Sequence, residues 1–186
     1  MVALSSLWLP VLLSAAIVFV ASFLAHMVLP HHKGDFRKVP AEDEARGALR
    51  KLNLTPGEYM LPRPDSPAAM KSPEFLEKMN QGPVLLMTVR PSGPPAMGPS
   101  LLLYFLYCVA VSVFAAYVTG RALPAGTGYR EVFRFAGTTA FIGYVVALWQ
   151  DSIWHGRPWS TTLKLTSDGL VYALLTAGTF GWLWPR

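Results

Sequence analysis

The chain contains little cysteine and little charge. Its single cysteine, Cys108, lies inside a long apolar run, which excludes an intrachain disulfide and a cysteine metal cluster. Charged residues make up 15% of the 186 residues and hydrophobic residues 52%, a balance that a soluble domain of this size seldom shows. The composition therefore indicates a membrane protein without a large soluble core.

The sequence also lacks the short motifs that accompany common enzyme chemistries. It has no phosphate-binding glycine loop, no H-E-x-x-H, no C-x-x-C and no G-x-S-x-G. We therefore expect a protein that is not an enzyme, and we predict no cofactor from motifs. The net charge of +5 comes from basic residues beside the apolar runs, so it predicts contacts with lipid headgroups rather than with nucleic acid.

Four long apolar stretches dominate the sequence, at 3–28, 100–120, 131–150 and 163–184. Each is long enough to cross a hydrocarbon core of about 30 Å at about 1.5 Å per residue. The first stretch has no preceding Lys or Arg and is too long for a signal peptide, so we expect a retained helix. The expected fold is an all-α membrane protein with four transmembrane helices and an extramembrane insert over 31–99.

The distribution of basic residues predicts an orientation. With four spans, both termini lie on one side, and the insert shares the other side with the link between the third and fourth spans. Basic residues near the membrane favour the insert side, with Lys33, Arg37, Lys38, Arg46, Arg50, Arg90, Arg157 and Lys164 against Arg121, Arg130, Arg134 and Arg186. The positive-inside rule then places the insert in the cytoplasm and both termini in the periplasm.

Tryptophans supply an independent argument for an even number of spans. Indole rings prefer the headgroup level, so they are expected as interfacial anchors at both membrane surfaces. In the four-span arrangement Trp8, Trp182 and Trp184 fall on the side of the termini, and Trp149, Trp154 and Trp159 fall on the insert side.

Small residues recur at four-residue spacing in two of the spans. The rows are Gly169, Ala173, Ala177 and Gly181 in the last span, and Cys108, Ser112, Ala116 and Gly120 in the second. Close backbone approach through small residues drives helix association in lipid, so we interpret both rows as helix-packing surfaces. Alanine and glycine are also common in membrane helices, so chance is the alternative explanation.

Ionisable residues lie near the ends of the expected spans. Lys164 and Asp168 are four residues apart at the start of the last span, where they are expected to pair on one helix face. A cap made by Ser167 and Asp168 is the alternative if that helix begins late. Asp151 ends the third span. No charge is expected near the middle of a span, where an ion site or proton relay would lie.

The four histidines all fall on the insert side of this topology. His26, His31 and His32 close the first span, and His155 follows the third, near Asp151. Imidazole and carboxylate groups from separate helix ends are ligands for a divalent metal, and a histidine can also ligate a haem. The spacing matches no specific metal motif, and histidine is ordinary at membrane interfaces, so both interpretations stay open.

The insert is predicted to be partly structured. Pro40 to Asn53 has acidic residues at its start and basic residues at its end, as a helix favours. Ser72 followed by Pro73 predicts a second helix that ends near Gly82. Val84 to Val89 is typical of a strand, with which Tyr59 to Leu61 could pair as a small sheet. An insert this small buries little by itself, so we expect it to lean on the membrane or on a partner.

Four segments along nearly the whole chain stand out: Leu7-Trp8-Leu9-Pro10, Met70-Lys71-Ser72-Pro73-Glu74, Gly82-Pro83-Val84 and the stretch Thr176 to Pro185. In these segments the chain resembles a family of small uncharacterised bacterial inner-membrane proteins. The resemblance implies a bacterial inner membrane and no particular activity.

Three functional hypotheses follow from the sequence. The first is a non-enzymatic accessory or structural subunit that packs against a larger membrane complex, for example a bioenergetic one, or against itself. The second is a small transporter or channel that works as an oligomer, with Asp151 or Asp168 required for flux. The third is a metal- or haem-binding membrane protein that uses its histidines.

Overall fold

The computed structural model describes all residues from Met1 to Arg186, which divide into two compact units. The helical unit contains Met1–Phe36 and Ala96–Arg186, and the insert unit contains Arg37–Pro95. The chain is mostly helical, with one small two-stranded sheet.

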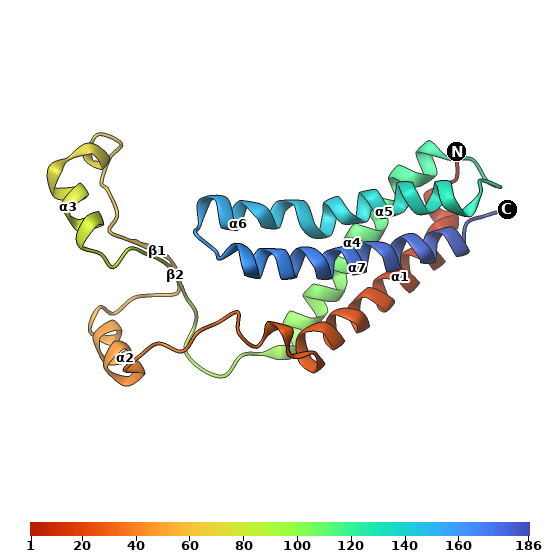
Figure 1. Ribbon diagram of the computed structural model, residues 1–186. Coiled ribbons are helices and arrows are strands. Elements are labelled where there is room, and N and C mark those ends of the chain that lie inside the picture. Colours follow the sequence, from red (N-terminus) through yellow and green to blue (C-terminus); the bar gives the residue numbers. More distant parts are fainter. The chain divides into compact units, whose positions relative to one another are not determined.

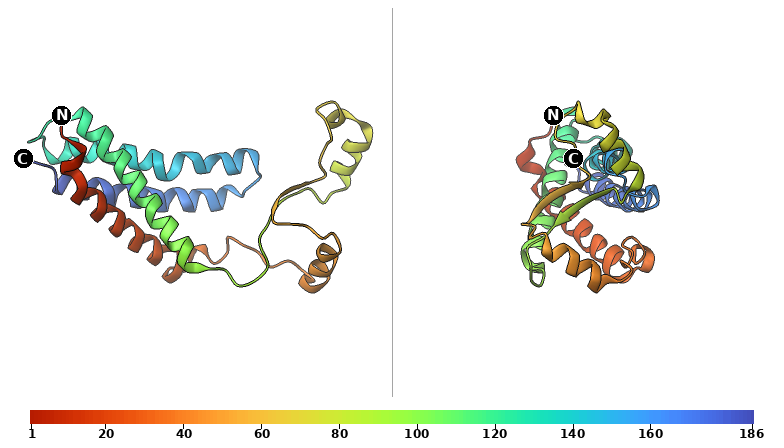
Figure 2. Two further views of the ribbon diagram at one scale, coloured as in Figure 1. Left: turned by 180° about the vertical axis from the view of Figure 1, so that it is seen from behind. Right: turned by 90° about the vertical axis from the view of Figure 1, so that its left-hand side faces the viewer.

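Four long helices build the helical unit (Figure 1). Helix α1 (Trp8–Phe23) is continued by a π-helical turn at Leu24–Val28, and α4 (Met97–Ala122) is continuous. Helix α5 (Tyr129–Val145) continues through a 3-10 turn into α6 (Trp149–Trp154), and α7 (Trp159–Trp182) returns beside it. The views in Figures 1 and 2 place both termini at the same end of this unit.

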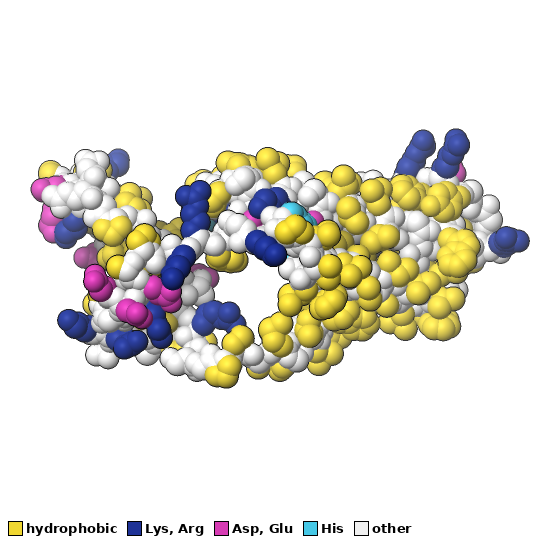
Figure 3. Space-filling view, turned by 60° about the horizontal axis from the view of Figure 1, so that its bottom comes forward, with side chains coloured by type: hydrophobic (Ala, Val, Ile, Leu, Met, Phe, Trp, Pro, Cys, Tyr) yellow, Lys and Arg dark blue, Asp and Glu magenta, His cyan; other side chains and the backbone are white.

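Three of these helical segments are long and apolar enough to cross a membrane: Leu4–Val28, Met97–Ala122 and Tyr129–Trp154. Hydrophobic side chains cover much of the face of the helical unit seen in Figure 3. These features indicate integration in a membrane. The expected fourth span, α7, has 24 residues but is less apolar, because it carries Lys164, Asp168 and several hydroxyl side chains.

The link between α6 and α7 shifts the start of the last helix relative to the expectation. Gly156, at φ +69°, ends α6 in the left-handed conformation that glycine favours, and Pro158 directly precedes α7. Helix α7 therefore begins at Trp159 rather than at 163. Asp168 is then the tenth residue of the helix, about 14 Å along its axis.

Small residues bring α5 and α7 close together. A methyl group added to Gly137 of α5 would lie 2.9 Å from Cβ of Ala177, and one added to Gly181 would lie 2.7 Å from the ring of Tyr129. Both separations are shorter than real Cβ contacts, so glycine is needed at these positions. Gly169 and Ala173 of the same row also pack in this region, against Val145 and in the core.

The corresponding row on α4 contacts α1. Oγ of Ser14 donates to Oγ of Ser112 at 3.0 Å, and the N–H of Val2 donates to the carbonyl of Gly120 at 2.8 Å. Cys108 and Ala116 are fully buried in the two core clusters of the unit. The bundle thus closes through small residues on both helix pairs, as packing in lipid requires.

The tryptophans are exposed with one exception. Trp8, Trp149, Trp154, Trp159 and Trp182 lie at the surface. Trp184 differs from the expected anchor, because it is only 7% exposed and packs in a core cluster. Its indole Nε1–H donates to the carbonyl of Pro124 at 3.0 Å, so the chain end is held against the link between α4 and α5.

The insert unit contains the predicted helices and sheet. Helix α2 is Glu42–Lys51 and α3 is Pro73–Gln81, where Oγ of Ser72 caps α3 by accepting from the N–H of Phe75 at 3.2 Å. Strands β1 (Gly57–Leu61) and β2 (Leu85–Val89) pair antiparallel, with Tyr59 opposite Met87. The predicted pairing of these strands is confirmed. No residue of Arg37–Pro95 is buried.

Candidate functional site

Three histidines and two aspartates meet where the chain leaves α1 and passes α7. His26 lies in the π-helical turn that ends α1, and His31 and His32 lie on the 3-10 turn Pro30–His32. An extended residue, Leu29 (ψ 140°), separates the two turns and folds the second one back toward α7. Helix α7 contributes Lys164 and Asp168, which face this segment. A π-helical turn of this kind is frequent at functional sites.

His32 is the centre of this cluster. Its Nδ1 donates to Oδ2 of Asp35 and its Nε2 donates to Oδ2 of Asp168, both at 2.6 Å. Because both ring nitrogens donate, the ring is an imidazolium in this arrangement. Nε2 of His31 donates to the second oxygen of Asp168 at 3.1 Å. The Asp168 carboxylate therefore accepts hydrogen bonds from two imidazoles.

Lys164 completes the network from the other side. Its Nζ donates to Oδ1 of Asp35 at 2.7 Å and to the backbone carbonyl of His31 at 2.6 Å. The expected pairing of Lys164 with Asp168 is wrong, since each residue instead binds the segment that follows α1. The reason is that the fold packs the segment after α1 against α7. Lys164 therefore pairs with Asp35, and Asp168 pairs with His32.

The local charges shift two pKa values. Burial lowers the pKa of His32, but the hydrogen bonds to Asp35 and Asp168 outweigh it, so the pKa is raised overall. The hydrogen bond from Lys164, followed by that from His32, lowers the pKa of Asp35. The ammonium and the imidazolium thus balance the two carboxylates.

Asp168 is a buried charge within a long helix. Its side chain is only 10% exposed, as are those of His32 and Asp35. The alternative that Asp168 caps a late helix start is wrong, because α7 begins nine residues earlier. A buried carboxylate at such a position requires partners and is a functional-site candidate.

The same residues have the chemistry of a metal site. The ligating atoms of His26, His32 and Asp168 all lie within 4.8 Å of one another. Nδ1 of His26 donates to the carbonyl of Ser22 at 3.1 Å, and Nδ1 of His32 donates to Asp35, so Nε2 is the nitrogen that each ring would offer to a metal. Nε2 of His32 would first lose the proton that it donates to Asp168. Metal-binding histidines are characteristically oriented in this way by a carbonyl or carboxylate. Nε2 of His31, beside Asp168, is available as a fourth ligand.

The rings lie close enough for coordination after a small adjustment. The imidazoles of His26 and His32 stack with centroids 4.4 Å apart, and those of His31 and His32 lie 4.0 Å apart. Ligand atoms of a tetrahedral site with bonds of about 2.1 Å are roughly 3.4 Å apart.

Two of the residues expected in a metal site lie elsewhere. Asp151 and His155 form their own pair on α6 at 3.1 Å, and Nη1 of Arg157 donates to Asp151 at 2.9 Å. This group is more exposed than the cluster around His32. The predicted set therefore divides, with His26, His31 and His32 brought together and Asp151 and His155 left apart. Asp168 was not predicted as a metal ligand. Its signal in the sequence was a carboxylate within an apolar run, which indicates a functional residue.

A cavity of about 470 Å³ adjoins the cluster inside the helical unit. Tyr144 and Tyr172 are 5% and 7% exposed, and neither hydroxyl has a hydrogen-bond partner. An unpaired buried hydroxyl costs about 1–3 kcal/mol. The cavity is lined by Ser22, His26, Tyr104, Tyr107, Tyr144, Leu148, Leu165, Asp168, Gly169 and Tyr172.

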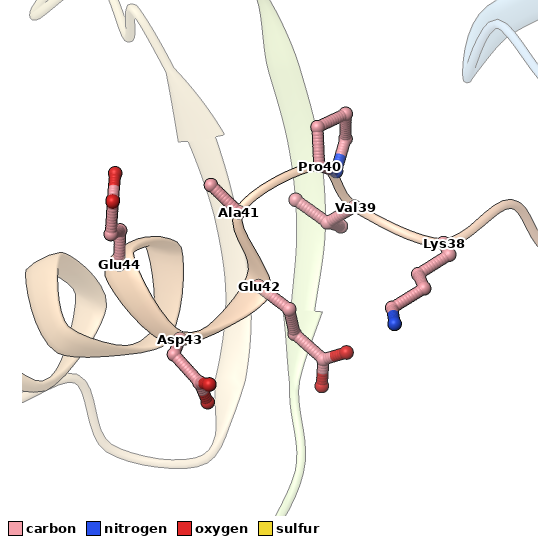
Figure 4. Close-up of a pocket in the computed structure, with 7 residues that line it drawn as sticks. All are labelled: Lys38, Val39, Pro40, Ala41, Glu42, Asp43 and Glu44. Atoms are coloured by element: carbon pink, nitrogen blue, oxygen red, sulfur yellow. The ribbon is translucent and has the colours of Figure 1, made fainter.

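A hollow of the insert unit has no comparable chemistry. It is lined by consecutive residues, Lys38 to Glu44, at the start of α2. The carboxylates of Glu42, Asp43 and Glu44 point in different directions (Figure 4). These groups do not converge on a common point, so the hollow is not a candidate site.

Replacing Asp168 should destabilise the protein far more than replacing Asp151. Asp168→Asn leaves His32 and Lys164 with one carboxylate between them in a buried site, so we expect a loss of about 3 kcal/mol in the free energy of unfolding. Asp151→Asn removes an exposed pair and should cost less than about 1 kcal/mol. Denaturation of the purified protein in detergent with EDTA measures both, and equal losses would contradict this account of the cluster.

Comparison with protein-family models, with curated proteins and with solved structures found no match. The resemblance to small bacterial inner-membrane proteins therefore stays a prediction, and the candidate function rests on the geometry of this chain.

Proposed function

We propose that this chain is an integral membrane protein that binds one divalent transition metal through His26, His32 and Asp168. The observation that carries the proposal is that both imidazoles are held at Nδ1 by an oxygen and that ligating atoms of His26, His32 and Asp168 lie within 4.8 Å of one another. His31 supplies a further nitrogen beside Asp168.

The ligand set indicates which metals fit. Two or three imidazoles with one carboxylate suit zinc, iron or copper, whereas magnesium and calcium prefer oxygen ligands alone. A metal at Nε2 of His32 replaces the proton that now joins this ring to Asp168, so binding should release a proton. Lys164 and Asp35 hold the ring in place during this exchange.

Metal binding is tested with zinc on the purified protein. Equilibrium dialysis followed by elemental analysis should give one zinc per chain, and His26→Ala should bind it about 10- to 100-fold more weakly. His26 is the informative residue, because the Ser22 carbonyl is its only hydrogen-bond partner, so its loss removes no hydrogen bond of the ion network.

His155→Ala is the matched control, since His155 lies outside the cluster and should leave the stoichiometry at one. Less than one zinc per chain in the native protein at saturating zinc, or equal losses in the two variants, would refute a metal site at the cluster.

We further propose that α7 is a fourth span, with the insert in the cytoplasm and both termini in the periplasm of a bacterial inner membrane. The length of α7, its close packing on α5 and the excess of basic residues on the insert side support this topology.

Cysteine labelling on intact cells tests the topology. In a Cys108→Ser background, Ser5→Cys and Arg186→Cys should react with a membrane-impermeant maleimide, whereas Ser66→Cys and Ser160→Cys should react only after permeabilisation. Labelling of residues 160 and 186 from the same side would show that α7 does not cross the membrane.

A second candidate function is that of an accessory subunit of a larger membrane complex. The observation in its favour is that the insert unit contains two helices and a sheet but buries none of its residues. Leu76, Val84 and Leu86 are among its exposed apolar side chains. A unit of this kind gains stability by packing on another surface.

Purification in a mild detergent tests the second candidate. A subunit should elute from size exclusion with other membrane proteins at constant stoichiometry, and a harsher detergent should release it. A monodisperse single chain from native membranes under mild conditions would count against it without affecting the metal site.

A further inference from the structure

The cavity of about 470 Å³ beside the histidine cluster shares two residues with the proposed metal site. His26 and Asp168 line the cavity, and their ligating atoms lie within 4.8 Å of each other and of that of His32. A metal held by these three residues would therefore lie at the wall of the cavity. A molecule in the cavity would then be close enough to coordinate that metal.

We propose that a metal bound at the cluster keeps one coordination position open toward this cavity, and that a neutral, largely apolar molecule binds there through one nitrogen or oxygen donor. The proposal rests on the metal site proposed above and adds a second ligand to it. Structural zinc sites have four protein ligands, whereas sites with three protein ligands keep a position for water or substrate. His26, His32 and Asp168 are a set of the second kind.

The other groups of the cluster lie away from the cavity. His32 and His31 bind the two oxygens of Asp168, but neither histidine lines the cavity. The same holds for Lys164 and Asp35, which bind each other beside them. The cavity thus reaches the metal ligands on a side that the ion network leaves uncovered, so a position left open on the metal is directed there.

The lining favours a neutral and largely apolar molecule. Two leucines and four tyrosines line the cavity, and no Lys or Arg does. The hydroxyl of Tyr107 donates to a backbone carbonyl of α5 at 2.8 Å, and those of Tyr144 and Tyr172 have almost no accessible surface. These three tyrosines therefore offer the cavity mainly carbon. A charged molecule would lose its hydration here and find no cationic side chain to replace it.

The size and the position of the cavity suit a small molecule that dissolves in lipid. Its volume falls within the range of about 300–1,000 Å³ usual for small-molecule sites. Tyr107 lines the cavity and is 42% exposed, so the cavity borders the outer face of α4, a helix apolar enough to span a membrane.

Cobalt(II) and 4-phenylimidazole test the open position on the protein in nanodiscs. Cobalt(II) accepts the same ligands as zinc, and its visible absorption bands change when a ligand is added. The probe carries one neutral nitrogen donor and an apolar ring. With one cobalt bound per chain, we expect a saturable change of the bands at one probe per chain. The probe should bind about tenfold more tightly than imidazole, because its phenyl ring is buried in the cavity.

Two tryptophan variants of α7 locate the probe. Leu165→Trp should fill the cavity and remove the tenfold preference while it still binds one cobalt per chain. Leu163→Trp is the matched control, because Leu163 is 61% exposed outside the cavity, and it should leave both affinities unchanged. Empty nanodiscs with cobalt supply the background.

Bound cobalt whose bands do not respond to the probe would overturn the open position and leave the metal site standing. If such a response appeared only in His31→Ala, His31 would be the fourth ligand that closes the position, which also overturns it. An equal preference in the two tryptophan variants would place the probe outside the cavity, again against the proposal. Failure to bind cobalt at all would instead refute the metal site on which the proposal rests.

Discussion

The burial of the Asp168 carboxylate is the constraint on which the helical unit depends. A charge held that far along a helix in an apolar bundle is tolerated only when its oxygens are occupied. His31 and His32 occupy them, and this requirement holds the chain after α1 against α7. Asp35 balances the positive charge that His32 and Lys164 add, so the network joins two parts of the chain that lie 129 to 136 residues apart.

Close helix packing makes this arrangement possible. Gly137 and Ala177 let α5 and α7 approach until no methyl group fits at Gly137. Ser14 of α1 and Ser112 of α4 are close enough to form a hydrogen bond between their hydroxyls. With little hydrophobic driving force between helices in lipid, such contacts and hydrogen bonds provide the association energy. The tyrosines below the cluster are an exception to tight packing, since they leave a cavity and two unpaired hydroxyls.

The cluster and the cavity share one wall. Asp168 and Tyr172 lie one turn apart on α7, and Ser22 and His26 lie one turn apart at the end of the first helix, so His26 and Asp168 belong both to the cluster and to the wall of the cavity. This sharing follows from the helical repeat, because residues four apart lie on the same face.

The sequence by itself determined the apolar helices, the insert with its capped helix and its strand pairing, and the proximity of His26, His31 and His32 at the end of the first apolar stretch. These features depend on local hydrophobicity and on residues close in the chain. The start of α7, the burial of Asp168 and the exchange of partners by Lys164 were decided only by the tertiary structure. The tertiary structure also decided the position of Trp184, which is buried in the core and not exposed as expected for an interfacial anchor. Each of these features depends on which distant segment packs against the residue, because a charged group or an indole N–H forms its hydrogen bonds with the groups that the folded chain brings within reach.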